Sequence, residues 1–399
     1  MRTWRLFVVL LVSFLALSIG AAHPRNQALP VGGKEIPELA AFDTAMQDFM
    51  AAREVKAGVL VIMKDNTVIY ERSFGWKDRE ATIPLDPTAL MRIASVSKPF
   101  TMAAIEQLIA NGVMNRNDYA FCLGRNSGCW LTLEPFGTPD GQLQDITIDH
   151  LLKHEGGWNR DVSGDPPFKT RMIADALGVP SPAQPADVTR YMMGQPLDFT
   201  PGTNSVYSNF GYMVLGLIIE AASGKSYEAY IQDNLLPTLG IARSEVQLGR
   251  SLPEQRNPRE PWYDSPFTTE SVFPPYNTVS WTDGGWYLEG MAAHGGLITT
   301  GRSLVKFAAV RNGQGKLYNG GESWTWFGSL DGTFSMLRWR PDNVLIGVIF
   351  NRRDGQPTFD DIEPLMNNTA DSITNWPTQS VDPPPVVFKS YLFLPLMVQ

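Results

Sequence analysis

Two short stretches of this chain carry residue types that could form a covalent intermediate with an acyl group. The first is a Ser-x-x-Lys tetrad at Ser95 and Lys98, and the second contains Tyr207 and Asn209. A serine hydroxyl is a poor nucleophile at neutral pH and needs a base within hydrogen-bonding distance. On a helix, residues three positions apart share a face, which would bring the serine hydroxyl and the lysine amine together. The two stretches together predict a serine acyl-transfer site.

A second Ser-x-x-Lys tetrad occurs at Ser303 and Lys306, so the surroundings must distinguish the two. Ser95 shortly precedes Pro99, which is tolerated only near a helix start, and apolar residues then recur at helical spacing. Ser95 is therefore expected at a helix N-terminus, where free N–H groups favour developing negative charge. The residues around Ser303 are typical of an ordinary buried helix, which favours Ser95 as the nucleophile.

The first 22 residues have the pattern of a secretory signal peptide. Arg2 and Arg5 precede an apolar run, and small residues follow up to a predicted cleavage point after Ala22. An uncleaved membrane anchor is the alternative, although the run is short for a membrane span. We therefore expect an exported protein, either secreted or held in the periplasm or at the cell surface. A net charge of -8 argues against nucleic acid or an anionic membrane as partner.

The rest of the chain has no internal repeat, which predicts one large domain or two interleaved lobes over residues 23–377. Residues 378–399 are predicted to form a Pro-rich linker and an apolar C-terminal tail. Cys122 and Cys129 are the two cysteines, and in an exported protein their close spacing favours a disulfide. Two free thiols are the alternative, and zinc binding is disfavoured because further ligands would be needed.

Hydrophobic periodicity and turn residues predict the main elements around these motifs. Helices are predicted over residues 37–56, 146–154, 211–223 and 227–236, after Ser95, and near the end up to Trp376. Two β-hairpins are predicted, with strands at 58–63 and 68–74 and at 334–339 and 344–350. Residues 251–275 lack clear periodicity and are interpreted as a long surface or site-covering loop.

With these segments in place, the chain resembles the serine hydrolases of the class C β-lactamase and penicillin-binding protein family. That family also includes D,D-peptidases, esterases and D-amino-acid amidases. Besides the two motifs, the resemblance rests on residues 146–157, 201–216, 224–227 and 236–240, which occur in the corresponding order. It implies an α/β (α+β) fold with a five-stranded antiparallel sheet flanked by helices, a mainly helical lobe, and the site between them. Both hairpins would belong to the sheet, where the first and last elements meet.

The resemblance also implies roles for individual residues. Ser95 would be the nucleophile, with Lys98 and Tyr207 as its acid and base partners, and Asn209 would bind the substrate and the lysine. A phenol becomes a usable base when a lysine ammonium lies beside it. The backbone N–H groups of Ser95 and Ser329 would stabilise the oxyanion. No cofactor and no metal are expected.

The third family motif differs from the usual pattern. Its cationic first residue, lysine or histidine in relatives, corresponds here to Trp326, whereas the small Gly328 is retained. Without a cation at this position, recognition of penicillins and terminal D-Ala-D-Ala is in doubt. Arg338 or Arg340 could replace it, although both are expected to face solvent. His294, followed by two glycines, is a competing match for this motif and a candidate for the pocket lining.

These observations favour an exported, carboxylesterase-like hydrolase acting on a small molecule or peptide. D,D-carboxypeptidase or β-lactamase activity is the alternative. An α/β-hydrolase is disfavoured because the chain has no Gly-x-Ser-x-Gly. His150 and His154 could begin a zinc site but are interpreted as a capping or core pair at a helix end. A non-catalytic cell-wall binding protein is the remaining class, and the intact Ser95, Lys98, Tyr207 and Asn209 argue against it.

Overall fold

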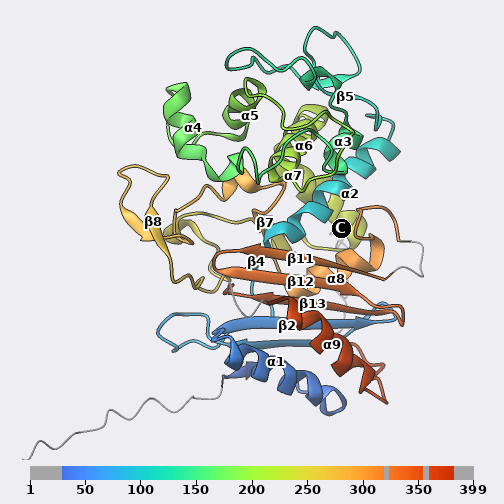
Figure 1. Ribbon diagram of the computed structural model, residues 1–399. Helices are drawn as coiled ribbons and strands as arrows, with labels where there is room; N and C mark the ends of the chain where they lie inside the picture. The colour runs from blue at the N-terminus through green and yellow to red at the C-terminus, as the bar shows by residue number, and fades with distance from the viewer. Residues whose placement is uncertain (1–28, 319–322, 354–358, 382–399) are drawn as a thin grey trace, which may run out of the picture.

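The computed structural model describes residues 29–318, 323–353 and 359–381. The predicted signal segment and residues 382–399 of the predicted tail lie outside the described residues. Figure 1 shows a sheet with helices against it and a mainly helical lobe beyond one edge of the sheet.

The central sheet is antiparallel throughout. Its strand order is β1 (Val31–Gly32), β3 (Thr67–Gly75), β2 (Ala57–Lys64), β13 (Val344–Phe350), β12 (Thr333–Trp339) and β11 (Trp324–Leu330). Five of the strands have seven residues or more, and the two-residue β1 adds a sixth strand at one edge. β2 pairs with β13, with Lys64 opposite Val344, so the first and last hairpins meet as predicted.

Alternation along the strands separates two apolar layers. On β2, Val59 and Val61 belong to one buried cluster, whereas Leu60 and Ile62 belong to the other. Successive strand residues point to opposite faces, and burial on both faces makes the strands read as continuous apolar runs. Helices α1 (Ala40–Ala52) and α9 (Ile362–Asp371) cover one face (Figure 1), and α8 (Gly301–Val310) covers the other.

The mainly helical lobe contains five further helices and the buried α2 (Ser97–Ala110) beneath them. These helices are α3 (Ile148–Leu152), α4 (Thr170–Leu177), α5 (Pro185–Met193), α6 (Asn209–Ser223) and α7 (Tyr227–Tyr230). A small sheet of order β4 (Met91–Arg92), β10 (Leu297–Thr299) and β7 (Val246–Leu248) lies next to the segment that carries Ser95.

Several predicted helices are shorter than expected. The predicted helix 146–154 is limited to α3, because Thr147 and His150 form a capping box at its start and His154 has a φ of 61° beyond its end. The predicted helix 227–236 begins as α7 and continues through a π-helical turn, Ile231–Leu235. Helix α1 stops at Ala52, and α9 stops at Asp371 rather than near Trp376.

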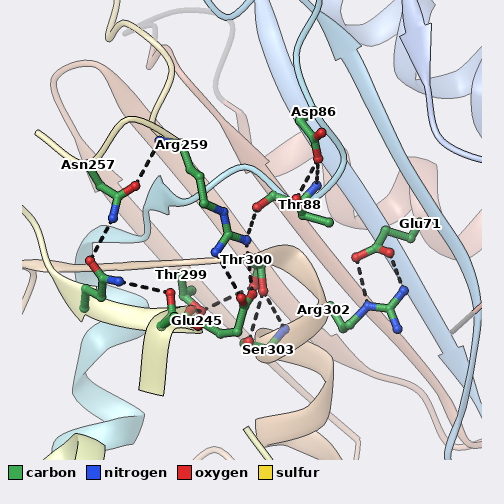
Figure 2. A network of polar contacts seen from close by, with 12 residues as sticks. Glu71, Asp86, Thr88, Glu245, Asn257, Arg259, Thr299, Thr300, Arg302 and Ser303 are labelled. Carbon is green, nitrogen blue, oxygen red and sulfur yellow. Dashed lines mark hydrogen bonds and ion pairs between the residues drawn. The ribbon is translucent and has the colours of Figure 1, made fainter. Parts of the chain in front are cut away.

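The segment predicted as a loop, residues 251–275, contains one short strand. This strand, β8 (Thr268–Glu270), pairs with β9 (Thr278–Ser280) in a small hairpin. Figure 2 shows how the segment is attached: Arg259 forms an ion pair with Glu245 and donates to the Thr88 carbonyl.

The predicted disulfide is present. Cys122 and Cys129 are bonded, with Cα atoms 5.0 Å apart, beside the short parallel strands β5 (Tyr119–Phe121) and β6 (Cys129–Leu131). Within the described parts of the chain, none of the helices has both the length and the apolar character needed to cross a membrane.

Candidate active site

Ser95 lies in a tight turn that joins the small sheet to helix α2. Strand β4 ends at Arg92, a 3₁₀ turn covers Ala94–Val96, and α2 begins at Ser97. Ala94 has a φ of 45°, a left-handed conformation that costs a non-glycine residue about 1–2 kcal/mol. Such strain persists only where the surroundings impose it, and Ala94 is fully buried. The half-buried Ser95 therefore immediately precedes the helix.

Lys98 is fully buried, and its Nζ atom has three oxygen partners. The distances are 3.2 Å to Ser95 Oγ, 2.8 Å to Asn209 Oδ1 and 2.8 Å to the carbonyl oxygen of His294. Burial holds the pKa of Lys98 well below its usual value, although the carboxyl of Asp165 raises it. A neutral amine is therefore accessible at this position.

Tyr207 lies on the other side of the serine hydroxyl, to which its own hydroxyl donates a hydrogen bond of 2.6 Å. Its ring lies 4.7 Å from Lys98 Nζ and 4.9 Å from the guanidinium carbon of Arg160. Burial raises the pKa of Tyr207 to about 12, so burial outweighs the lowering expected from a neighbouring cation. At neutral pH the phenol therefore keeps its proton.

These three side chains form a chain of hydrogen bonds that can move a proton. The Tyr207 hydroxyl donates to Ser95 Oγ, which leaves the Ser95 proton free to point at a neutral Lys98 amine. Transfer of that proton to the amine would leave a serine alkoxide, the form that attacks a carbonyl carbon. The structure thus brings together the residues that the sequence motifs singled out.

The second tetrad has no such surroundings. Ser303 is buried, and its hydroxyl bonds the hydroxyl of Thr300 at 3.0 Å (Figure 2), where Thr300 caps helix α8. Lys306 Nζ lies 3.5 Å from the carbonyl oxygen of Gly240, away from Ser303. This serine lies in the first turn of a buried helix, and the residues around it indicated such a helix.

Ser95 opens onto a cavity of about 500 Å³. Tyr207, Asn209 and His294 line it together with Ser329, and several residues that no motif had indicated also contribute: Arg160, Asp165, Phe168, Trp281, Trp286, Asp331 and Arg353. The Trp281 and Trp286 ring centroids lie 6.0 Å apart, and Phe168 lies 6.4 Å from Trp286, which makes one wall aromatic. Apart from Phe168, which ends a short 3₁₀ helix, these residues come from irregular segments, and the sequence signal nearest to them was the predicted site-covering loop just before Trp281.

The third motif lies on β11, the sheet edge beside Ser95, but its residues do not all face the cavity. Trp326 Nε1 donates to the Ser95 carbonyl oxygen at 2.9 Å, and the indole lines a neighbouring cavity. A Cβ atom on Gly328 would lie 2.1 Å from the carbonyl oxygen of Ile93, so glycine is needed for contact with the nucleophile's own segment. The close approach expected for Gly328 is therefore to the protein backbone, whereas Phe327 and Ser329, on either side of it, line the cavity.

Neither arginine considered as a replacement cation reaches the cavity, and the expectation that they face solvent was wrong. Arg338 contacts Thr325 and Glu363, and Arg340 pairs with Asp342 and Asp371. Helix α9 contributes two of these carboxylates, and the arginine side chains are only 10–15% exposed. The guanidinium groups that line the cavity belong to Arg160 and Arg353.

The histidines near the site have structural contacts. His154 Nδ1 accepts from the Ser208 N–H at 3.1 Å, and burial, followed by the charge of Lys98, lowers the pKa of His154 to about 4. His150 forms the capping box of α3, so this pair lies at a helix end as predicted. His294 lines the cavity, and burial holds the pKa of its ring well below its usual value, which keeps it neutral.

The family model described as beta-lactamase matches residues 42–323. The chain is 30% identical over 202 residues to penicillin-binding protein 4* of Bacillus subtilis, covering 50% of this chain and 40% of that protein. It is 27% identical over 251 residues to a putative D-alanyl-D-alanine carboxypeptidase of Escherichia coli O157:H7, covering 59% of this chain and 54% of that protein. The chain thus spans about half the length of these curated relatives, or less.

Among solved structures, D-amino acid amidase of Ochrobactrum anthropi aligns with a TM-score of 0.60 at 18% identity, covering 84% of this chain and 98% of that one. This likeness shows the fold, a β-lactamase/transpeptidase-like sheet with a helical lobe. The family match extends over most of the chain and includes the segments that carry Ser95, Lys98 and Tyr207. The chain belongs to the beta-lactamase family of serine hydrolases.

Proposed function

We propose that this protein hydrolyses ester or amide bonds through a covalent acyl-enzyme on Ser95. The observation that carries the proposal is the position of Ser95 Oγ, 2.6 Å from the Tyr207 hydroxyl and 3.2 Å from Lys98 Nζ. A nucleophile held between two proton-transfer groups at the floor of a cavity is the arrangement that acyl transfer requires.

In the first half of the reaction, Ser95 gives its proton to the Lys98 amine while Oγ attacks the carbonyl carbon. The backbone N–H groups of Ser95 and Ser329 would bind the resulting oxyanion. The tetrahedral intermediate then collapses, the leaving alcohol or amine takes a proton from Tyr207, and the proton that Lys98 accepted from Ser95 restores the phenol.

In the second half, a water molecule gives one proton to the same pair and attacks the acyl carbon. The bond from Ser95 to the acyl group breaks, Oγ regains its proton, and the carboxylic acid leaves. Because Lys98 and Tyr207 each act in both halves, the free enzyme is restored without any further reactant.

We propose uncharged esters as the first substrate class. Phe168, Trp281 and Trp286 give the cavity an aromatic wall that suits an apolar acyl or alcohol group. The sequence prediction of an esterase rested instead on Trp326, which lines a neighbouring cavity.

A second candidate, D,D-carboxypeptidase or β-lactamase activity, is favoured by Arg160 and Arg353. Both line the cavity, and a guanidinium pairs well with the carboxylate that such substrates carry. The relatives named as penicillin-binding protein and carboxypeptidase support the same alternative.

Action outside the cytoplasm is part of the proposal. The apolar N-terminal segment and the Cys122–Cys129 disulfide support it, since disulfides persist mainly in oxidising compartments.

Labelling with a fluorophosphonate probe, followed by mass spectrometry of the modified peptide, tests the nucleophile. We expect the label on Ser95 and none on Ser303. An unlabelled protein would point to a non-catalytic cell-wall binding role, and a label elsewhere would overturn the assignment of Ser95.

The ratio kcat/KM for short-acyl esters, a cephalosporin and a peptide ending in D-Ala-D-Ala tests the substrate class. We expect the esters to have the highest ratio. Arg353→Gln should lower the ratio for the two carboxylate substrates and leave the ester ratio unchanged. A wild-type preference for a carboxylate substrate would favour the second candidate.

A further inference from the structure

Asp165 lies in the same cavity but belongs to none of the sequence motifs. It is half-buried, in the loop just before Pro166, and its Oδ2 atom accepts a hydrogen bond of 2.6 Å from Asn209 Nδ2. The Asn209 Oδ1 atom at the other end of that amide accepts from Lys98 Nζ at 2.8 Å. Asp165 is therefore two hydrogen bonds away from the amine beside the nucleophile.

A side-chain amide can be turned either way round, and the two orientations have opposite effects on Lys98. With Oδ1 toward the lysine, the amide accepts a lysine N–H, whereas with Nδ2 toward it the amide offers a donor. An ionised carboxylate only accepts, so Asp165 requires the Nδ2 end of Asn209. The Oδ1 end must then face Lys98.

The orientation of Asn209 decides where the lone pair of a neutral Lys98 points. A neutral amine has two N–H bonds and one lone pair. The carbonyl oxygen of His294 and Asn209 Oδ1, each 2.8 Å away, can only accept, so they take the two N–H bonds. The third partner is Ser95 Oγ, and the lone pair is directed at the serine proton.

We propose that Asp165 is a positioning residue that fixes the Asn209 amide and thereby directs the base lone pair of Lys98 at Ser95. This inference rests on the proposed acyl-enzyme function. If Asp165 cannot hold the amide, Asn209 can turn its donor toward the amine and capture the lone pair that Ser95 needs.

The charge of Asp165 affects the pKa of Lys98, which a residue with a purely structural role would not change. Its carboxylate stabilises the ammonium form of Lys98 and so raises the lysine pKa, against the larger lowering by burial. Removing that charge should lower the pKa of Lys98 further. The other charged groups facing the pair are Arg160 and Lys169, and the nearby rings of His154, Tyr207 and His294 are neutral at pH 7.

The test uses Asp165→Asn, which keeps the size of the side chain but can donate as well as accept a hydrogen bond. We expect kcat on a short-acyl ester to fall about 10-fold or more, as for other residues that orient a reacting group, with little change in KM. The acid limb of the kcat profile should move to lower pH, because Lys98 loses a neighbouring negative charge. Asp165→Glu keeps the acceptor and should recover part of kcat.

Asp161→Asn is the matched control, since Asp161 is an exposed carboxylate in the same loop. It should leave kcat and the pH profile unchanged. Thermal melting of each variant separates a loss of folding from a loss of positioning. The rate of fluorophosphonate labelling, measured as a function of pH, reports the reactivity of Ser95 without a substrate.

Two results would overturn the proposal. If Asp165→Asn retains kcat and its acid limb while Ser95→Ala is inactive, the acyl-enzyme function stands and the positioning role is wrong. Retained turnover in Ser95→Ala would overturn the acyl-enzyme function and, with it, the role of Asp165.

Discussion

The two Ser-x-x-Lys tetrads of this protein have the same residue types at the same spacing but very different surroundings. At the first, Ser95 precedes its helix and opens onto a cavity, and Lys98 is completely buried. At the second, Ser303 is buried within the first turn of α8, and Lys306 points away from it. The tetrad by itself therefore supplies only proximity of the two side chains. Burial of the amine, a second proton donor and access to a substrate come from other parts of the chain.

The largest expected effect comes from exchanging each serine for alanine. Ser95→Ala should lower kcat about a million-fold, as when a serine nucleophile is removed elsewhere, without changing the fold. Ser303→Ala should leave turnover unchanged and lower the melting temperature slightly, because Ser303 takes part in the cap of α8. Ester turnover and circular dichroism of both variants check this. Equal losses from the two substitutions would contradict the distinction.

The next effect concerns the partners of Ser95. Lys98→Met and Tyr207→Phe should each lower kcat about 10²- to 10⁴-fold, since both belong to one proton-transfer chain. The double variant should be hardly worse than either single one, because groups that act as a unit are not additive. Lys306→Met is the matched control and should have no effect on kcat. Additive losses in the cycle would show that the two residues act independently.

A smaller effect should appear in stability. Burial lowers the pKa of Lys98 in the folded state, so between that pKa and the unfolded value near 10.4 the unfolded chain binds more protons. The free energy of unfolding contributed by this residue therefore rises with pH in that window and is reduced below it. Lys98→Met should be more stable than the wild type at pH 7, and its free energy of unfolding should depend less on pH between 7 and 9. Urea unfolding across that range measures the difference, and a parallel pH dependence in both proteins would exclude this role.

The smallest effect should come from the disulfide, whose two cysteines belong to neither tetrad. Closing the short loop between Cys122 and Cys129 is expected to contribute roughly 2.5 kcal/mol to stability by loop-closure entropy. The double variant to serine should unfold at lower urea concentration and retain its ester kcat. Alkylation of the unreduced wild type should add no mass, and two added labels would mean free thiols.

Much of the sheet could be predicted from the sequence, because strands buried on both faces leave continuous apolar runs between turn residues. The hairpin of β2 and β3 and that of β12 and β13 fall within a residue or two of the predicted strands. Helix ends were less predictable. The end of α3, for example, depends on the left-handed backbone conformation of His154. The His154 and Tyr207 ring centroids lie 4.8 Å apart, and Tyr207 is far from His154 in the sequence.

The residues of the candidate site also differ in how far they could be predicted from the sequence. Ser95, Lys98, Tyr207 and Asn209 stand in recognisable local patterns, and the structure brings their polar atoms into contact. Asp165 and the arginines that line the cavity, together with its aromatic wall, come from irregular loops whose side-chain directions only tertiary packing decides. Trp326 was matched to the cationic residue of the third motif, but its indole donates to the Ser95 carbonyl oxygen and lines a neighbouring cavity.

The pairing of β2 with β13 has a consequence for how the chain can acquire its structure. β2 can complete its hydrogen bonds only after Val344–Phe350 has been synthesised, so the N-terminal hairpin keeps an open edge during most of translation. Contacts so distant along the chain slow folding and prolong exposure of apolar strands. The family match, residues 42–323, stops before β11, β12 and β13. A protein truncated to that segment would lack four of the six strands described for the central sheet, β1 included, and is expected to aggregate on expression.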